Sequence, residues 1–88
     1  MTLEHSLIEF PSDFPIKVFG LAHEGFTQAV IEVISAYDPE FKASSIETRN
    51  SKTARYVSLT CTVRATSREQ LDAIYQALCD HPMVAMAL

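Results

Sequence analysis

The side chains of this chain that could bind a metal or act as nucleophiles are few and widely spaced. Its histidines and cysteines are His5, His23, His81, Cys61 and Cys79. Their spacing matches neither the Cys-x₂-Cys nor the His-x₃-His pairs of zinc sites. A nucleophilic cysteine or serine needs a base within reach, and no spacing in this sequence indicates one. We therefore expect no metal, no cofactor and no catalytic residues.

A cluster of basic residues could bind an anion or an acidic partner protein. Arg49, Lys52 and Arg55 surround a predicted turn at residues 51–53. Clustered cations attract carboxylates and phosphates. The alternative is a solvated turn whose charges keep an edge hairpin from aggregating.

A second candidate site is the short stretch between a predicted strand and a predicted helix. It consists of Gly20, Leu21, Ala22 and His23. The first N–H groups of a helix favour a negative group, and glycine permits close approach to the backbone. A small anionic metabolite is the ligand that this stretch would suit.

The hydrophobic pattern predicts six elements that position these residues. Strands are expected over 14–21, 44–50, 56–65 and 83–88, and helices over 24–37 and 67–81. Residues 56–65 alternate strictly, which indicates one buried and one exposed face. Ser67 and Gln70 have the spacing of a capping box. The apolar helix faces are expected to be Phe26, Val30, Val33, Ile34 and Tyr37 in the first helix, and Leu71, Ile74, Tyr75 and Leu78 in the second.

The order βαββαβ predicts an α+β ferredoxin-like sandwich, because right-handed crossovers place both helices on one face of a four-stranded antiparallel sheet. Residues 14–88 form the single domain. Residues 1–13 form an N-terminal arm packed on it, with a turn at Ser12 and Asp13. The other sheet face is open, and there Lys17 and Tyr56 extend the candidate partner site. The open face is expected to carry Lys17, Phe19, Tyr56, Ser58, Thr60, Thr62 and Arg64.

Two other functions of such a fold fit the sequence less well. RNA-binding sheets stack bases on aromatic side chains; Phe19 and Tyr56 qualify, but Ser58 and Thr60 stand where further aromatics are needed. Acylphosphatase chemistry needs an arginine in the first strand–helix loop, and residues 20–25 contain none. Nucleic-acid contact through the open face and an unrecognised small enzyme remain the alternatives.

Composition and charge restrict the cellular location and the kinds of partner that we expect. The net charge of −4 disfavours general binding to nucleic acid. No apolar run is long enough to span a membrane, and the acidic start lacks the basic residues of a secretory signal. We expect a cytoplasmic protein with reduced cysteines and no membrane partner. The apolar last strand is an edge that could pair in a homodimer.

Several stretches resemble the YbeD-like family of small bacterial proteins. They are Leu7-Ile8-Glu9-Phe10-Pro11, then Phe14, Lys17, Val18 and Gly20, then Tyr56-Val57-Ser58, Ala65-Thr66, Glu69-Gln70, Tyr75 and Leu78. The resemblance implies a ferredoxin-like fold similar to the ACT regulatory domains, which bind small ligands after the first strand, here Gly20–His23. A link with lipoate metabolism has been suggested for the family. Ala54 replaces a glycine that is usual there, so a left-handed turn conformation at this position cannot be carried over from the family.

The sequence thus predicts a small non-catalytic regulatory or interaction module. Its ligand would be a partner protein or a small anionic metabolite, whose identity the residues do not specify.

Overall fold

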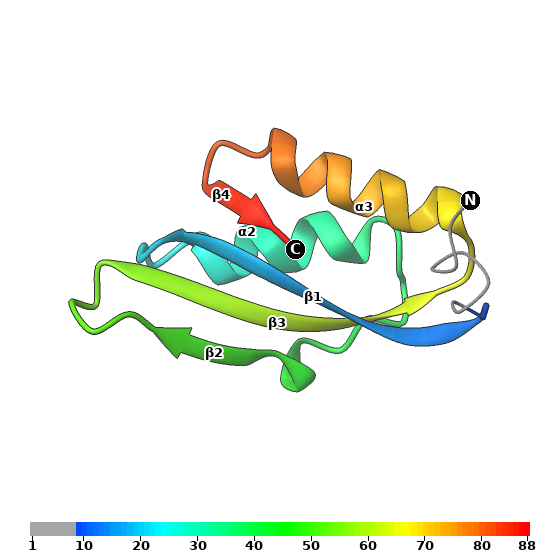
Figure 1. The fold of residues 1–88 in the computed structure, drawn as a ribbon, viewed down its shortest axis with the longest axis horizontal. Coiled ribbons are helices and arrows are strands. Elements are labelled where there is room, and N and C mark those ends of the chain that lie inside the picture. Colours follow the sequence, from blue (N-terminus) through cyan, green and yellow to red (C-terminus); the bar gives the residue numbers. More distant parts are fainter. Residues whose placement is uncertain (1–8) are drawn as a thin grey trace, which may run out of the picture.

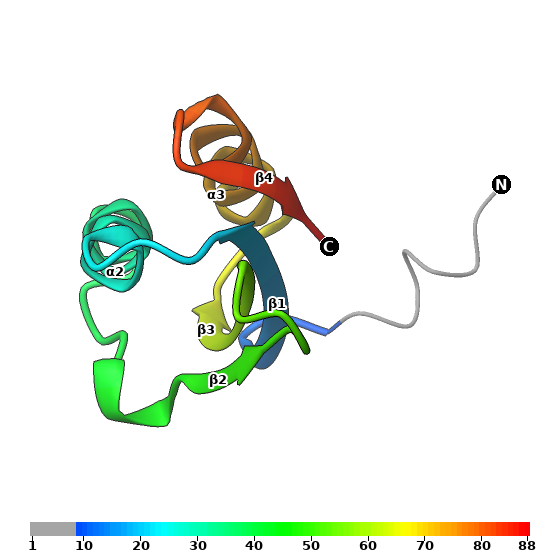
Figure 2. The same cartoon turned by 90° about the vertical axis from the view of Figure 1, so that its left-hand side faces the viewer.

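The computed structural model describes residues 9–88, which contain four strands and two α-helices in the predicted order. Strand β1 spans Ser12–Leu21, helix α2 Phe26–Ser35, strand β2 Glu47–Asn50, strand β3 Tyr56–Ala65, helix α3 Arg68–Asp80 and strand β4 Val84–Ala87; a short 3-10 helix, η1, spans Ala43–Ser45. The sheet is antiparallel, with the order β2-β3-β1-β4. Both helices cover the same face of it (Figures 1 and 2). The predicted ferredoxin-like sandwich is confirmed.

The core lies between the sheet and the two helices. Alternate residues of β1 and β3 point into it, as the period of two requires, and one stripe of each helix covers them. The core residues are Ile16, Val18, Phe26, Val30, Ile34, Val57, Leu59, Cys61, Val63, Ala65, Leu71, Ile74 and Leu78. Tyr37 was expected on the buried stripe of the first helix, but α2 ends at Ser35 and the Tyr37 side chain is exposed.

The N-terminal end of the sheet differs from the prediction. Ser12 and Asp13 are not in a turn but begin β1, where they pair with Ala65 and Arg64. Pro15 fits in this strand although it has no N–H. Lys17, two residues further on, exchanges backbone hydrogen bonds with Leu88, so the nitrogen of Pro15 points to the same side. Strand β4 does not extend as far as Pro15. The missing N–H of Pro15 therefore faces an unpaired edge. Residues 1–8 of the predicted arm lie outside the described residues.

The predicted second strand is shorter than expected. Its first residues form η1, in which the Ser45 hydroxyl donates to the Lys42 carbonyl at 2.7 Å and the Ser45 amide donates to the same oxygen at 3.0 Å. A serine that bonds to nearby backbone competes with strand pairing. Strand β2 therefore begins only at Glu47.

The predicted cap of the second helix is confirmed. The Ser67 hydroxyl accepts from the Gln70 amide at 3.0 Å. The Gln70 side chain accepts from the Thr66 amide at 2.7 Å and donates to the Tyr37 carbonyl at 3.0 Å. The Gln70 side chain therefore bonds to the residue before the cap instead of to the Ser67 amide of a full capping box, and it joins the helix start to the segment that follows α2.

The hairpin between β2 and β3 contains a left-handed residue that the sequence did not lead us to expect. Ala54 has a φ of 58°, and its amide donates to the Ser51 carbonyl at 2.9 Å. The Ser51 hydroxyl accepts from the Tyr56 amide at 3.1 Å. These bonds hold the turn in a left-handed conformation, which glycine adopts more readily than the alanine that occupies it.

Replacing Ala54 by glycine should stabilise the protein. The left-handed conformation costs an L-residue about 1–2 kcal/mol, and the greater chain entropy of unfolded glycine removes part of that gain. We expect a net increase of about 0.5–1 kcal/mol in the free energy of unfolding, measured by urea denaturation. An Ala54→Gly protein less stable than the wild type would show that the turn is not strained.

Candidate functional site

Contacts within the chain use part of the loop predicted to bind a small anion, while its Leu21 and His23 line a hollow of about 260 Å³ together with residues 82–85. A Cβ placed on Gly20 would meet the Phe26 ring and, at 2.5 Å, the Met83 carbonyl. The Ala22 amide donates to the Arg55 carbonyl at 2.8 Å, and the Gly25 amide donates to His23 Nδ1 at 3.0 Å. Gly20 therefore permits packing of β1 against α2 and β4, and these backbone donors are already used.

The open sheet face brings together residues from all four strands. Residues paired across strands share a face, so the ladder defines rows that run across the sheet. One row is Arg49, Ser58, Phe19 and Met86. The next is Glu47, Thr60 and Lys17, with Leu88 beyond Lys17. Lys17, Phe19 and Arg49, which were singled out in the sequence, therefore lie on two adjoining rows of one face.

This face also holds most of the exposed apolar surface. Within residues 9–88, six large hydrophobic side chains are exposed. Four of them lie on this face: Leu21, Tyr56, Met86 and Leu88, at 58, 52, 46 and 62% exposure. Clustered exposed apolar residues mark interaction surfaces more often than single ones do.

Two adjoining hollows lie on the open face and share Arg49 and Ser58 as lining residues. One, of about 190 Å³, includes Phe19 and Tyr56; the other, of about 290 Å³, includes Lys17 and Glu47. The ion pairs found in the described part of the chain are Arg64–Asp13 and Arg68–Asp72, neither of which involves Lys17 or Arg49. An acidic group could reach both cations without displacing a partner found in that part of the structure. We call Lys17, Phe19, Arg49, Tyr56 and Ser58 the open-face site.

The remaining predicted partner residues flank this site. Lys52 and Arg55 lie in the hairpin turn next to Tyr56, and both are exposed. The bond from Ala22 to the Arg55 carbonyl also places the Gly20–His23 loop beside this turn. The two sites predicted from the sequence are therefore neighbours at one end of the sheet.

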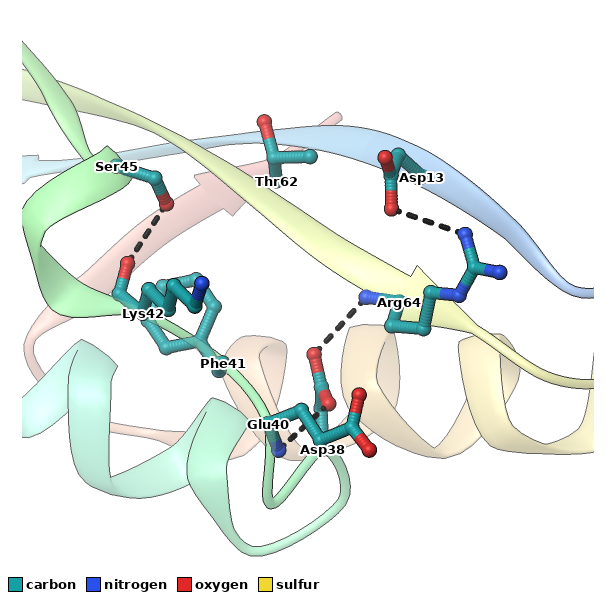
Figure 3. Close-up of a pocket in the computed structure, with 8 residues that line it drawn as sticks. All are labelled: Asp13, Asp38, Glu40, Phe41, Lys42, Ser45, Thr62 and Arg64. Atoms are coloured by element: carbon teal, nitrogen blue, oxygen red, sulfur yellow. Dashed lines mark hydrogen bonds and ion pairs between the residues drawn. The ribbon is translucent and has the colours of Figure 1, made fainter.

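A further hollow is lined by a buried carboxylate, Asp38, whose hydrogen bonds give it a structural role. It lies between the segment after α2 and the ends of β1 and β3, and Asp38, Glu40, Lys42 and Arg64 are among its lining residues (Figure 3). The buried Asp38 carboxylate accepts from the Arg64 amide at 2.9 Å and from the Glu40 amide at 3.1 Å. Asp38 thereby fastens this segment to β3. Among residues 9–88, no group of three His, Cys, Asp or Glu side chains could hold a metal.

The two cysteines differ sharply in exposure. Cys61 is fully buried in the core, and burial raises the pKa of its thiol to about 11, whereas Cys79 is exposed on α3. A thiol reagent should modify Cys79 in the native protein and reach Cys61 only after unfolding, because the thiolate is the reacting form. Mass spectrometry of the labelled protein measures this. Rapid modification of Cys61 under native conditions would contradict the packing of β3.

The same thiol predicts a pH dependence of stability. Unfolded Cys61 loses its proton near its ordinary pKa of 9.0, whereas folded Cys61 keeps it to about 11. The folded state therefore binds more protons in this interval, so the free energy of unfolding should fall as the pH rises from 9 to 11. A Cys61→Ala protein provides the control, and its decline over this interval should be smaller.

Phe19 and Lys17 were placed correctly from the alternation of β1, but the apolar contribution of β4 was not foreseen. Val84, Met86 and Leu88 alternate in the sequence, which suggests one shared face. A register shift next to Gly20 pairs Val84 with Gly20 on the core side, whereas Met86 pairs with Phe19 on the open side. Nothing in the alternation itself signals this bulge.

Comparison with known proteins gives consistent matches. Residues 5–88 match the model of a family described as "Protein of unknown function (DUF493)". The UPF0250 protein of Nitrosomonas europaea is 55% identical over 85 residues, covering 97% of this chain and 98% of the relative. The UPF0250 protein of Janthinobacterium sp. is 60% identical over 83 residues, covering 94% and 91%.

The fold has a counterpart among solved structures. The solution structure of protein HP0495 from H. pylori superposes with a TM-score of 0.75 at 21% identity, covering 92% of this chain and 85% of that one. At this identity the likeness supports the fold. No helix in residues 9–88 has the length and apolar character needed to cross a membrane. The family resemblance seen in the sequence is confirmed, since YbeD is itself a UPF0250 protein. This chain belongs to the DUF493, or UPF0250, family.

Proposed function

We propose that this protein is a non-catalytic, cytoplasmic interaction module that binds an acidic segment of a partner protein on the open-face site. The observation that supports this most directly is the row Arg49, Ser58, Phe19 and Met86, which places a cation, an aromatic ring and an exposed apolar side chain on one line across the sheet. Interfaces commonly combine aromatic and arginine anchors in this way.

Charge complementarity favours an acidic partner. Lys17, Arg49, Lys52 and Arg55 lie on or beside the open-face site, with Glu47 as the nearby acid on the same rows. The whole chain has a net charge of −4, so this end is positive against the overall charge. Local positive potential steers an acidic segment to the site and fixes its orientation.

A small anionic metabolite at Gly20–His23 is the less favoured ligand. Gly20 is packed beneath Phe26 and the Met83 carbonyl, and the Ala22 and Gly25 amides have partners within the chain. Nucleic acid on the open face is a second candidate, favoured by the joint presence of Phe19 and Tyr56 in one hollow, since such rings can stack on bases.

Charge reversal tests the proposal. The tagged protein is used to capture partners from an extract of the host bacterium, and the Lys17→Glu, Arg49→Glu double variant is compared with Lys42→Glu, Arg68→Glu, which has the same net charge change elsewhere. We expect the first variant to capture at least about tenfold less of the partner than the wild type does. Added salt should weaken capture by the wild type. Equal capture by both double variants would refute the site, and capture that depends on nucleic acid would favour the second candidate.

A further inference from the structure

Strand β4 forms one edge of the sheet and carries no protective charge. In residues 9–88 it pairs with β1 alone, so its outer edge is unpaired. The stretch 82–88 reads Pro-Met-Val-Ala-Met-Ala-Leu and contains no Asp, Glu, Lys or Arg. At the opposite edge, β2 carries Glu47 and Arg49. Sheet edges are normally guarded by charges of that kind.

The backbone of β4 has hydrogen-bonding groups available at this edge. Lys17 and Leu88 exchange both of their backbone bonds, at 2.9 and 2.8 Å. Antiparallel ladders alternate such bonded pairs with pairs whose groups point to the other side. Ala87, the next residue, therefore directs its N–H and carbonyl away from β1. The adjacent side chains of Ala85, Met86 and Leu88 are exposed.

We infer that β4 pairs with β4 of a second copy of this chain, in antiparallel orientation, to form a continuous eight-stranded sheet. Charge points to a second copy as the occupant. Each copy has a net charge of −4, so two copies repel over most of their surface, but this edge is apolar and carries no charged side chain. An antiparallel pair is self-complementary, as a two-fold interface requires. A partner recognised through its charge would gain nothing at this edge.

The pairing has a structural consequence for the open-face site. The two-fold axis of an antiparallel pair within one sheet runs perpendicular to the sheet, so both open faces lie on the same side. Met86 and Leu88 of each copy then lie between the two open-face sites and bury part of the apolar surface now exposed. The dimer would present two basic sites to one partner, which strengthens binding without new contacts. The pairing itself does not depend on what the open face binds.

The test is the oligomeric state of matched edge variants. Ala85→Lys places a charge on the β4 edge, as natural edges do. Ala87→Pro removes an outward N–H and leaves the bonds to β1 in place. Asn50→Lys is the control on the β2 edge. Circular dichroism and thermal melting first establish that each variant is folded.

Analytical ultracentrifugation is then run at protein concentrations up to several hundred micromolar. This is on the order of the dissociation constant of the weakest dimer that strand pairing would give. We expect the wild type and Asn50→Lys to form dimers, and Ala85→Lys and Ala87→Pro to dimerise at least about tenfold more weakly. Hydrogen exchange of the Ala87 amide with solvent should slow as the protein concentration rises. A monomeric wild type, dimers that persist in both β4 variants, or dimers lost in Asn50→Lys would each overturn the inference.

Discussion

A Leu59→Asp protein should not fold. Leu59 lies at the centre of β3 with 0% exposure, opposite Val18 in the ladder and on the sheet face that the helices cover (Figure 1). A carboxylate at this position would be buried without a partner, at a cost of several kcal/mol. A domain of this length has a total stability of roughly 5–10 kcal/mol. We expect loss of the cooperative melting transition and of the native circular dichroism spectrum.

The neighbouring residue supplies the control. Ser58 is adjacent in sequence but lies on the open face beside Arg49. A Ser58→Asp protein should therefore keep its fold and change its melting temperature by only a few degrees, about the effect of 1 kcal/mol or less. A folded Leu59→Asp protein, or an unfolded Ser58→Asp protein, would show that the two faces of β3 are assigned the wrong way round.

The second large effect is expected at Gly20. A Gly20→Ala methyl group would collide with the Phe26 ring and lie 2.5 Å from the Met83 carbonyl. The carbonyl belongs to the segment leading into β4 and cannot move without shifting that strand. Overpacking typically costs 1–3 kcal/mol, and we expect about 3 kcal/mol here, a fall of on the order of 15 °C in the melting temperature.

Gly25 provides a matched glycine for comparison. A Cβ there would approach His23 Nδ1 at 3.4 Å, an ordinary contact, and its φ of −89° suits any residue. Gly25→Ala should stay within about 1 kcal/mol of the wild type. In a double-mutant cycle, Phe26→Leu should reduce the cost of Gly20→Ala, because the ring that the methyl meets is gone. A Gly20→Ala protein as stable as Gly25→Ala would indicate free space at Gly20, and the small-ligand hypothesis for the Gly20–His23 loop would then gain support.

The sequence predicts this fold well where one physical signal dominates. The strict alternation of β3 gave both its bounds and its buried face, and the Ser67 cap marked the start of α3. The helix stripe failed only at Tyr37, because its periodicity continues past the point where the helix ends. Short polar segments such as residues 43–46 were less predictable, since a few local side-chain bonds decide between a strand and a 3-10 turn.

The candidate site was predictable only in part. Alternation placed Lys17 and Tyr56 on the open face, and the structure joins them to Arg49 through the ladder. The role of Gly20 could not be foreseen. A glycine in a sequence indicates that something approaches the backbone closely, but it does not tell whether this is a ligand or another part of the chain. The apolar side chains Met86 and Leu88 reach the same face through a bulge, which depends on tertiary pairing.

Site-specific photocrosslinking in the host bacterium tests most directly whether the open face is the binding surface. A photoreactive phenylalanine analogue is placed at Phe19 on the open face, or at the exposed Gln76 on α3 as the control. We expect a discrete protein adduct from position 19 that disappears when Lys17 and Arg49 are both changed to glutamate, and no such adduct from position 76. An adduct formed from position 76 but not from position 19, or one from position 19 that survives charge reversal, would contradict the assignment of the open face as the binding surface.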